Sequence, residues 1–262
     1  MKESKVFRRI EKKYILTELQ YRILLKEIEG FMKIDNYGES EILNIYYDTP
    51  NFYLIRNSLD KPIYKEKLRL RTYGIPNDDA PAFIEIKKKF QDVVYKRRVQ
   101  MPYILAKSYL NGDIIPDTPL TPVEKQIFNE IEYFRNRYKT LSPQMSVCYK
   151  RIAMYGMDDP ELRITFDRAI NCRIDETDLR KGCYGEQIIR LDQHLMEIKI
   201  TGAMPLELAH ILSKLNIQST SFSKYGKGYE NLILKEEKTP KKIFTHNNIP
   251  IFGGHASAAA AY

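Results

Sequence analysis

Cations occupy every second position of the segment KEKLRLRTYG, residues 65–74, and these cations are Lys65, Lys67, Arg69 and Arg71. Successive side chains of a β-strand point to opposite faces, so all four would share one face if this segment is a strand. Guanidinium forks and ammonium groups on a common face suit the oxygens of phosphate groups. The alternative interpretation is a face exposed to bulk solvent, and the pattern of the other strands distinguishes the two.

The same alternation of charge recurs in other strand-like segments of the chain. The residues that share a face are Glu11 and Lys13, Glu85 and Lys87, Lys96 and Arg98, Arg163 and Asp167, and Glu197 and Lys199. The opposite faces are often apolar, as in AFIEIKKKF, residues 82–90. An apolar outer face needs a cover, and the chain has helical segments long enough to provide one. The charged faces are therefore predicted to converge on one lumen, with Arg98 and not Arg97 facing it.

The converging faces would carry more cations than carboxylates. The nine cations predicted to line the lumen are Lys13, Arg69, Arg71, Lys87, Lys96, Arg98, Arg151, Arg163 and Lys199, and the four carboxylates are Glu11, Glu85, Asp167 and Glu197. Unpaired buried charge is very costly, so such a lumen makes sense only if it is wet and filled by a polyanion. A few carboxylates could also hold Mg²⁺ or Mn²⁺ against the phosphates.

A second basic motif, SFSKYGKGY, covers residues 221–229 near the end of the chain. Lys224 and Lys227 flank Gly226 there, and the pattern predicts a flexible turn that leads into a helix. One interpretation is a simple basic loop. The other is an entrance that grips phosphate at one mouth of the lumen.

The composition fits a protein with an anionic partner. The 262 residues carry a formal net charge of +8, which favours an anionic ligand without identifying it. Cys148, Cys172 and Cys183 have no C-x-x-C spacing, so reduced thiols in the cytoplasm are predicted, with neither a zinc site nor a disulfide framework. No secretory signal and no membrane-spanning helix are predicted.

The residue patterns predict eight strands and several helices. The strands cover residues 7–15, 42–49, 64–73, 82–90, 92–101, 144–155, 161–170 and 188–201, and the helices cover residues 16–32, 121–139, 205–215 and 225–236. Thr17 and Thr121 are predicted N-caps, and Pro122 suits a first helical position. Eight antiparallel strands can close into a barrel whose interior holds one small ligand. We therefore predict an α+β fold with a closed eight-stranded antiparallel β-barrel and packed helices.

The chain is predicted to form one domain. It contains no internal repeat and no Pro- or Ser-rich linker, so residues 1–240 are assigned to a single tunnel domain. Residues 241–262 are low in complexity and are predicted to be a flexible or partly vector-derived tail.

Taken in order, nine segments of this chain resemble the triphosphate tunnel metalloenzyme superfamily, and within it the vacuolar transporter chaperone (VTC) domain of polyphosphate polymerases. The matching segments span residues 7 to about 230 and read IEKKY, YYDT, KLRLR, FIEIKKK, YKRRV, YKRIA, LRITFD, LMEIKI and SFSKYGKGY. The resemblance implies an eight-stranded tunnel that binds ATP and inorganic polyphosphate. It also implies transfer of the ATP γ-phosphate to a growing polyphosphate chain, with Mn²⁺ or Mg²⁺ as cofactor.

The resemblance also implies roles for individual residues. Those expected to bind phosphate or nucleotide are Lys13, Lys67, Arg69, Arg71, Lys87, Lys96, Arg98, Arg151, Arg163, Lys199, Lys224 and Lys227. Within this set, Arg69, Arg71, Lys224 and Lys227 are expected to act in catalysis, with the two lysines steering phosphate at one mouth. Glu197 is the expected metal ligand, with Glu85 and Glu11 as further metal partners.

The chain departs from the hydrolytic relatives in its carboxylates. Triphosphatases and related cyclases usually carry E-x-E pairs on the first and last strands, whereas this chain has Glu11-x-Lys13 and Glu197-x-Lys199. Fewer carboxylates favour transfer over activation of water. The alternatives are a triphosphate hydrolase of the same fold, or a non-catalytic module that binds polyphosphate, inositol phosphates or RNA. No DNA partner is expected, and a stand-alone protein of this kind could associate with a separate membrane protein.

Overall fold

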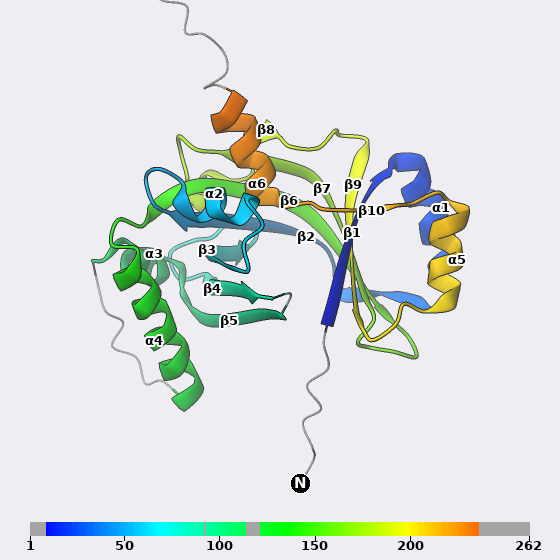
Figure 1. Ribbon diagram of the computed structural model, residues 1–262, viewed down its shortest axis with the longest axis horizontal. Coiled ribbons are helices and arrows are strands. Elements are labelled where there is room, and N and C mark those ends of the chain that lie inside the picture. The colour runs from blue at the N-terminus through cyan, green and yellow to red at the C-terminus, as the bar shows by residue number, and fades with distance from the viewer. Residues whose placement is uncertain (1–8, 92, 114–120, 236–262) are drawn as a thin grey trace, which may run out of the picture.

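A computed structural model describes residues 9–91, 93–113 and 121–235 of the chain (Figure 1). Its long strands are β1 (Arg9–Thr17), β2 (Met32–Asp48), β3 (Tyr64–Tyr73), β4 (Pro81–Phe90), β5 (Val93–Pro102), β6 (Ser142–Gly156), β7 (Arg163–Arg173) and β9 (Gln193–Thr201). These eight strands correspond to the eight predicted ones, and β2 begins ten residues earlier than expected. The predicted tail, residues 241–262, lies outside the described residues, and the assignment of residues 1–240 to one domain stays a prediction.

All strands belong to one antiparallel sheet. The order is β10-β1-β9-β7-β6-β2-β3-β4-β5, with the two-residue strands β8 (Glu186–Gln187) and β10 (Ser219–Thr220) added at β7 and β1. Within the described residues, no backbone hydrogen bonds join β5 to β1. The prediction of a large antiparallel sheet in an α+β fold is therefore confirmed. The hydrogen bonding of the described residues does not close the eight long strands into a barrel. Of these strands, β1 and β5 are the two outermost in the order, and they are not paired with each other in that part of the chain.

Helices cover the outer face of the sheet at its two ends. Helices α3 (Tyr103–Asn111) and α4 (Pro122–Arg137) pack on the face of β2–β5 that carries Leu68, Leu70 and Ile84. Helices α1 (Glu18–Ile28) and α5 (Leu206–Lys214) cover β1, β7 and β9 at the other end of the molecule (Figure 1). Thr17 and Thr121 are the N-caps of α1 and α4, as predicted, and each forms a capping box. The apolar residues of each strand are thus buried outward, and the charged residues remain on the inner face.

The inner face has its own lid, formed by the short helices α2 (Tyr53–Leu59) and α6 (Lys224–Tyr229). The lid packs on buried residues of β2, β6 and β7. Asp48 joins the two helices, because its carboxylate accepts hydrogen bonds from Leu54 N and Ile55 N of α2 and from the Tyr225 hydroxyl of α6. Both helices therefore hold fixed positions over the sheet.

The prediction of a flexible turn around Gly226 is wrong. Gly226 lies inside α6, and a short π-helix, Glu230–Leu234, follows directly. A Cβ on Gly226 would lie 3.0 Å from Leu59 Cδ2, and one on Gly228 would lie 2.6 Å from Met145 Sδ. These glycines allow α6 to approach its neighbours closely, which is a packing role and not a flexible one.

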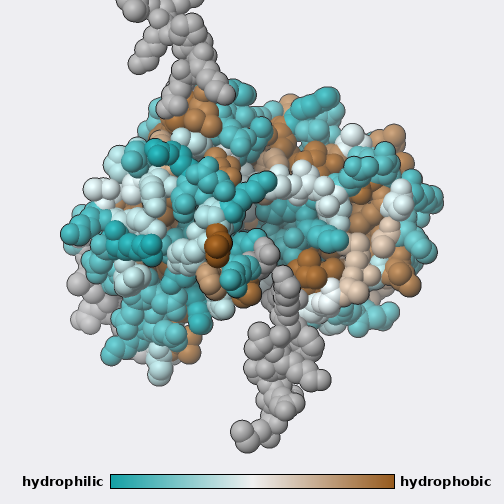
Figure 2. Space-filling view, viewed as in Figure 1, coloured by the Kyte–Doolittle hydropathy of each residue, from teal (hydrophilic) through white to brown (hydrophobic). Residues whose placement is uncertain are grey.

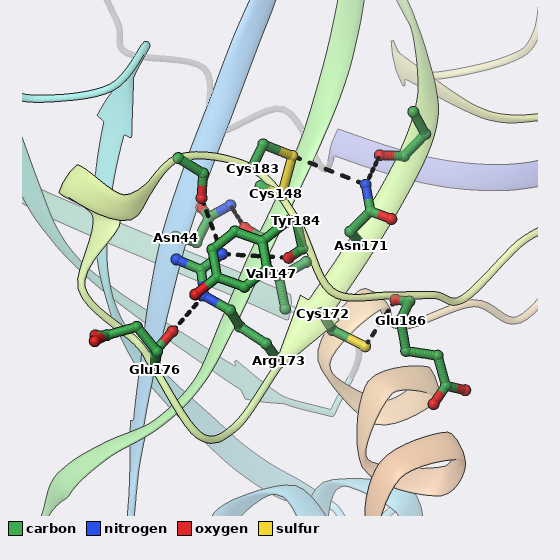
Figure 3. Close-up of a disulfide and its surroundings, with 12 residues drawn as sticks. Asn44, Val147, Cys148, Asn171, Cys172, Arg173, Glu176, Cys183, Tyr184 and Glu186 are labelled. Atoms are coloured by element: carbon green, nitrogen blue, oxygen red, sulfur yellow. Dashed lines mark hydrogen bonds between the residues drawn. A yellow bond between two sulfur atoms is a disulfide. The ribbon is translucent and has the colours of Figure 1, made fainter.

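The prediction that all three cysteines are reduced is also wrong. Cys148 of β6 and Cys183 form a disulfide, and Cys172 is free and buried (Figure 3). Residues 174–185, between β7 and β8, fold back over the outer face of the sheet. This path brings Cys183 to Cys148. The two cysteines are 35 residues apart in the sequence, so only the path of this loop reveals the pairing.

Arg173 holds the same loop in place through hydrogen bonds to its backbone. Its guanidinium donates to the carbonyl oxygens of Glu176, Asp178, Gly182 and Tyr184, and it lies over the Tyr184 ring at 4.1 Å (Figure 3). Backbone carbonyls buried in a loop need such donors. The disulfide and Arg173 together make the loop a rigid support for the outer core.

Reduction of the disulfide is expected to lower the free energy of unfolding by about 2–4 kcal/mol, because the crosslink restricts the unfolded chain. Denaturant titration with and without a thiol reductant measures this change. The Cys148→Ser variant should match the reduced wild type and should not respond to reductant. Equal denaturation midpoints for oxidised and reduced wild type would contradict the expectation.

Candidate functional site

Strand register brings most of the predicted site residues onto the inner face of the sheet. Lys67 pairs with Lys87 and Arg69 pairs with Glu85 across β3 and β4. Lys96 and Arg98 of β5 lie opposite Lys87 and Glu85. Arg97 instead contacts Glu130 of α4 on the outer face, at 3.7 Å. The predicted register of β5, with Lys96 and Arg98 facing inward, is therefore the one observed.

Glu85 is the centre of the first charged cluster. Arg69 Nε and Nη2 each lie 2.6 Å from Glu85 Oε2, and Lys96 Nζ lies 2.8 Å from Oε1. Arg71 Nε is farther away, 3.8 Å from Oε2. Burial favours the protonated carboxyl, but the three cations outweigh it and hold the pKa of Glu85 well below its usual range. This carboxylate is a counter-ion that fixes the cations of β3 and β5.

Glu197 and Asp167 form the second cluster, beneath α6. Lys224 Nζ lies 2.5 Å from Asp167 Oδ2 and 3.1 Å from Glu197 Oε1. Arg151 binds Asp167 through two hydrogen bonds of 2.6 and 2.7 Å, and its Nη2 lies 3.9 Å from Glu197 Oε2. Lys13 Nζ approaches Glu197 from β1 at 3.8 Å. Strands β1, β6, β7 and β9 and one helix thus meet at this point.

The second cluster is almost completely enclosed. The side chains of Asp167, Lys224 and Glu197 are 0%, 9% and 10% exposed. Burial alone would raise the carboxyl pKa values, but Lys224 and Arg151 lower the pKa of both Asp167 and Glu197. The carboxylates in turn raise the pKa of Lys224 against the effect of its own burial. All three groups are therefore charged at neutral pH.

Tyr149 of β6 connects the two clusters, and the sequence analysis did not assign it to the site. Its hydroxyl accepts a hydrogen bond of 3.2 Å from Arg71 Nη2, and its ring faces Lys224 Nζ at 4.6 Å and Arg151 Cζ at 5.2 Å. Burial raises the pKa of Tyr149, but Arg151, Arg71 and Lys224 lower it further. Its place two residues before Arg151 on the same strand face was the available signal.

Lys67, Lys87 and Lys13 form a third group on the inner face, in which cations outnumber carboxylates. Lys67 Nζ contacts Ser223 Oγ at 3.1 Å, and Lys87 Nζ reaches Glu11 Oε2 only at 4.0 Å. Burial and the neighbouring cations, Lys87 and Lys13 foremost, lower the pKa of Lys67 to about 7. The contact between Lys87 and Glu11 also shows that β4 and β1 face each other across the inner face. An anionic ligand would relieve the repulsion in this group.

The remaining predicted residues lie at the margins of the inner face. Arg163 pairs in register with Lys199, and Lys199 with Glu11, and neither cation has an ion-pair partner among the described residues. Arg98 lies over the Phe83 ring at 4.9 Å. Lys227 of α6 contacts Glu230 at 3.5 Å and has no contact with either cluster in the described part of the chain.

The carboxylates of the inner face fit a metal that substrate phosphates also hold. No group of three His, Cys, Asp or Glu side chains with metal-binding geometry occurs among residues 9–91, 93–113 and 121–235. Mg²⁺ and Mn²⁺ are often held by one or two carboxylates together with phosphate oxygens. Glu197 and Glu11, both near Lys13, suit this arrangement. Glu85 suits it less, since Arg69 and Lys96 hold its two oxygens at 2.6 and 2.8 Å. Among the described cations, only Lys224, at 3.1 Å, lies within hydrogen-bond distance of the Glu197 carboxylate.

In the view of Figure 2, hydrophilic residues cover much of the middle of the molecule, with hydrophobic residues among them. In the described residues, no helix combines the length and the apolar composition that crossing a membrane requires.

The profile of the family described as VTC domain matches residues 8–233. The chain belongs to the VTC-domain family. Among solved structures, this VTC domain is similar to HpAC1 of Hippeastrum, an adenylyl cyclase candidate reported to have a dominant triphosphatase activity. That match has a TM-score of 0.51 and 13% identity and covers 85% of this chain and 96% of HpAC1. It shows that the VTC domain has the fold of the triphosphate tunnel proteins.

An adenylate cyclase candidate from Vibrio parahaemolyticus matches with a TM-score of 0.42 at 13% identity, over 84% of this chain and 97% of that protein. No protein with a curated description matches the chain.

Proposed function

We propose that this VTC domain is a metal-dependent polyphosphate polymerase that transfers the γ-phosphate of ATP to a growing polyphosphate chain. The observation that carries the proposal is the inner face, where cations from β1, β3, β4, β5, β6 and α6 outnumber the carboxylates. A linear polyanion neutralises such a surface along its whole length. Membership of the VTC-domain family supports the same substrate class. The closed tunnel of that family stays a prediction for this chain.

The proposed roles follow the geometry of the clusters. Arg69, Arg71 and Arg151 are held by carboxylates and tyrosines in fixed directions, so they would orient phosphates without reorganising. Lys67 and Lys87 would bind the chain where counter-ions are scarce. The metal, held by Glu197 and Glu11 with substrate phosphates, would neutralise charge that develops on the phosphate oxygens. Lys227 of α6, which contacts Glu230 and, among the described residues, neither cluster, would guide the acceptor.

The arrangement of carboxylates favours transfer over hydrolysis. Hydrolysis needs a group that positions and deprotonates water. Glu85 is occupied by three cations, and Asp167 by Lys224 and Arg151. Carboxylates with low pKa values and fully occupied oxygens are weak bases. An in-line phosphate acceptor needs no such base.

A triphosphate hydrolase is the second candidate, and the similarity in fold to HpAC1 favours it over a purely binding role. A non-catalytic module that binds polyphosphate, inositol phosphates or RNA is the third. The cytoplasmic location and an association with a separate membrane protein stay predictions.

Incubation of the protein with ATP, Mn²⁺ and a short polyphosphate primer tests the proposal. We expect ADP and long-chain polyphosphate in matching amounts. Release of orthophosphate in amounts equal to ADP, with no polymer, would contradict the polymerase and support the hydrolase. Binding of polyphosphate with no ADP release would leave the non-catalytic module.

Binding of tripolyphosphate is expected to take up a proton at Lys67. The pKa of Lys67 is about 7 in the free protein, and a bound polyanion raises it, so the lysine gains a proton when the ligand binds near pH 8. Affinity should therefore fall between about pH 6.5 and 8.5 more steeply in wild type than in Lys67→Met. Calorimetry in two buffers of different ionisation enthalpy measures the uptake. Identical proton uptake in both proteins would contradict this role, and the ligand's own titration cancels in the comparison.

A further inference from the structure

Lys224 occupies the space in front of the metal carboxylate Glu197. Its ammonium lies between Glu197 Oε1, at 3.1 Å, and Asp167 Oδ2, at 2.5 Å, and its side chain is 9% exposed. The Tyr149 ring lies 4.6 Å from the same nitrogen. An ammonium placed between two carboxylate oxygens fills the position that a bridging cation would take.

We propose that Lys224 masks Glu197, so that Lys224 and a divalent cation are alternative partners of this carboxylate. In the protein without phosphate, Lys224 holds Glu197 and excludes the metal. The metal binds Glu197 only after the lysine has moved. Masking of Glu197 by Lys224 does not depend on the proposed function. Only its use during turnover rests on that function.

The charges around Glu197 support this exclusion. Lys224, Lys13 and Arg151 all have a nitrogen within 4.0 Å of a Glu197 oxygen, and Asp167 is the additional buried carboxylate of the cluster. With Glu11, which lies 3.4 Å from Lys13, three carboxylates face three cations, so the cluster is already neutralised and attracts a divalent ion weakly before any ligand is present. Replacing Lys224 by a neutral residue leaves the cluster with one more carboxylate than cations and uncovers one face of Glu197.

The position of Lys224 also shows what can release it. It is the first residue of α6, and Ser223 beside it contacts Lys67 of the third group, in which cations outnumber carboxylates. Phosphates bound at Lys67 would offer Lys224 new oxygens close to its present ones. Lys224 would then move from carboxylate to phosphate, and Glu197 would become available to the metal that accompanies that phosphate. Phosphate and metal would thus bind cooperatively, with the lysine as the coupling element.

Manganese binding in the absence of any phosphate tests the masking directly. Free Mn²⁺ is measured by electron paramagnetic resonance in titrations of wild type, Lys224→Met and Lys88→Met. We expect the dissociation constant of Lys224→Met to be at least about tenfold lower than that of wild type. Lys88→Met is the control, because Lys88 pairs with Glu130 on the outer face at 3.2 Å, and it should bind Mn²⁺ as wild type does. Equal affinities of Lys224→Met and wild type would overturn the proposal.

A second variant shows whether the gain in Mn²⁺ affinity arises at Glu197, and a further measurement applies if Lys224→Met does not fold. Lys224→Met/Glu197→Gln should lose the added affinity, and a gain that persists there would assign it to another site and overturn the proposal. Thermal denaturation shows whether Lys224→Met is folded. If it is not, a Mn²⁺-soaked crystal of wild type without phosphate decides, because Mn²⁺ bound to Glu197 with Lys224 still in place refutes masking, and no Mn²⁺ at Glu197 supports it. None of these readouts uses ATP, so failure of the polymerase assay leaves them interpretable.

Discussion

Glu197→Gln should reduce metal-dependent turnover by at least about a hundredfold while ATP still binds. The substitution keeps the shape of the side chain and removes the charge that a divalent ion needs, and metal stabilisation of phosphoryl transfer contributes several kcal/mol. The arginines and lysines of the inner face remain to hold the nucleotide. Release of ADP at saturating Mn²⁺ measures turnover, and calorimetry without metal measures nucleotide affinity.

Glu130→Gln is the matched control for that experiment. Glu130 pairs with Lys88 and Arg97 on the outer face, at 3.2 and 3.7 Å, away from the inner clusters. Its turnover should equal that of wild type. Unchanged activity of Glu197→Gln at saturating Mn²⁺ would rule out the metal role of Glu197.

Alanine at Arg69 or Arg71 should weaken the binding of tripolyphosphate by about 1.5–3 kcal/mol, which is roughly 10- to 150-fold. Each change removes a guanidinium that Glu85, Tyr46 or Tyr149 holds in a fixed direction. The affinity of wild type should also fall steeply with salt, and less steeply in the variants. Calorimetry at two salt concentrations measures both effects.

Arg97→Ala tests whether the loss depends on the inner face. Arg97 lies on β5 between Lys96 and Arg98 but contacts α4 on the outer side. Its removal should change affinity by less than about 0.5 kcal/mol, as for most surface substitutions. Equal affinities for wild type and both arginine variants would mean that the cations of β3 form only a solvated face. Because Arg71 is buried, its variant needs a thermal denaturation check.

The sequence allowed the strands and their faces to be predicted because charge and apolar residues alternate with a period of two. Residues 64–73 were predicted as a strand with the observed bounds, and the choice of Arg98 over Arg97 agrees with the observed register. A slip of one residue would bury the cations under α4 and expose Leu68 and Leu70, so the hydrophobic pattern fixes the register.

Other features of the site depend on contacts between residues distant in sequence. Tyr149 reads as a core tyrosine until Arg71 and Lys224 are placed beside it. Lys224 was predicted to move in a flexible turn, and instead α6 buries it against Asp167. The alternation along β6 places Tyr149 on the same face as Arg151, but the local pattern gives no signal for the partners of Tyr149 or of Lys224. The link between Cys148 and Cys183 was missed for the same reason, since the returning loop is irregular.

The pairing of β1 with β9 has a consequence for synthesis on the ribosome. β1 leaves the exit tunnel first, but β9 begins at Gln193 and both β10 and Lys224 follow it. The nascent chain therefore carries β1 with two unpaired edges until β9 and β10 have been made, and the carboxylates of Asp167 and Glu197 emerge before the lysine that neutralises them. Pairing over such sequence distances forms late and slowly. Truncated products that end before Gln193 should accordingly be targets for chaperones and proteases, since they lack the partner strand of β1.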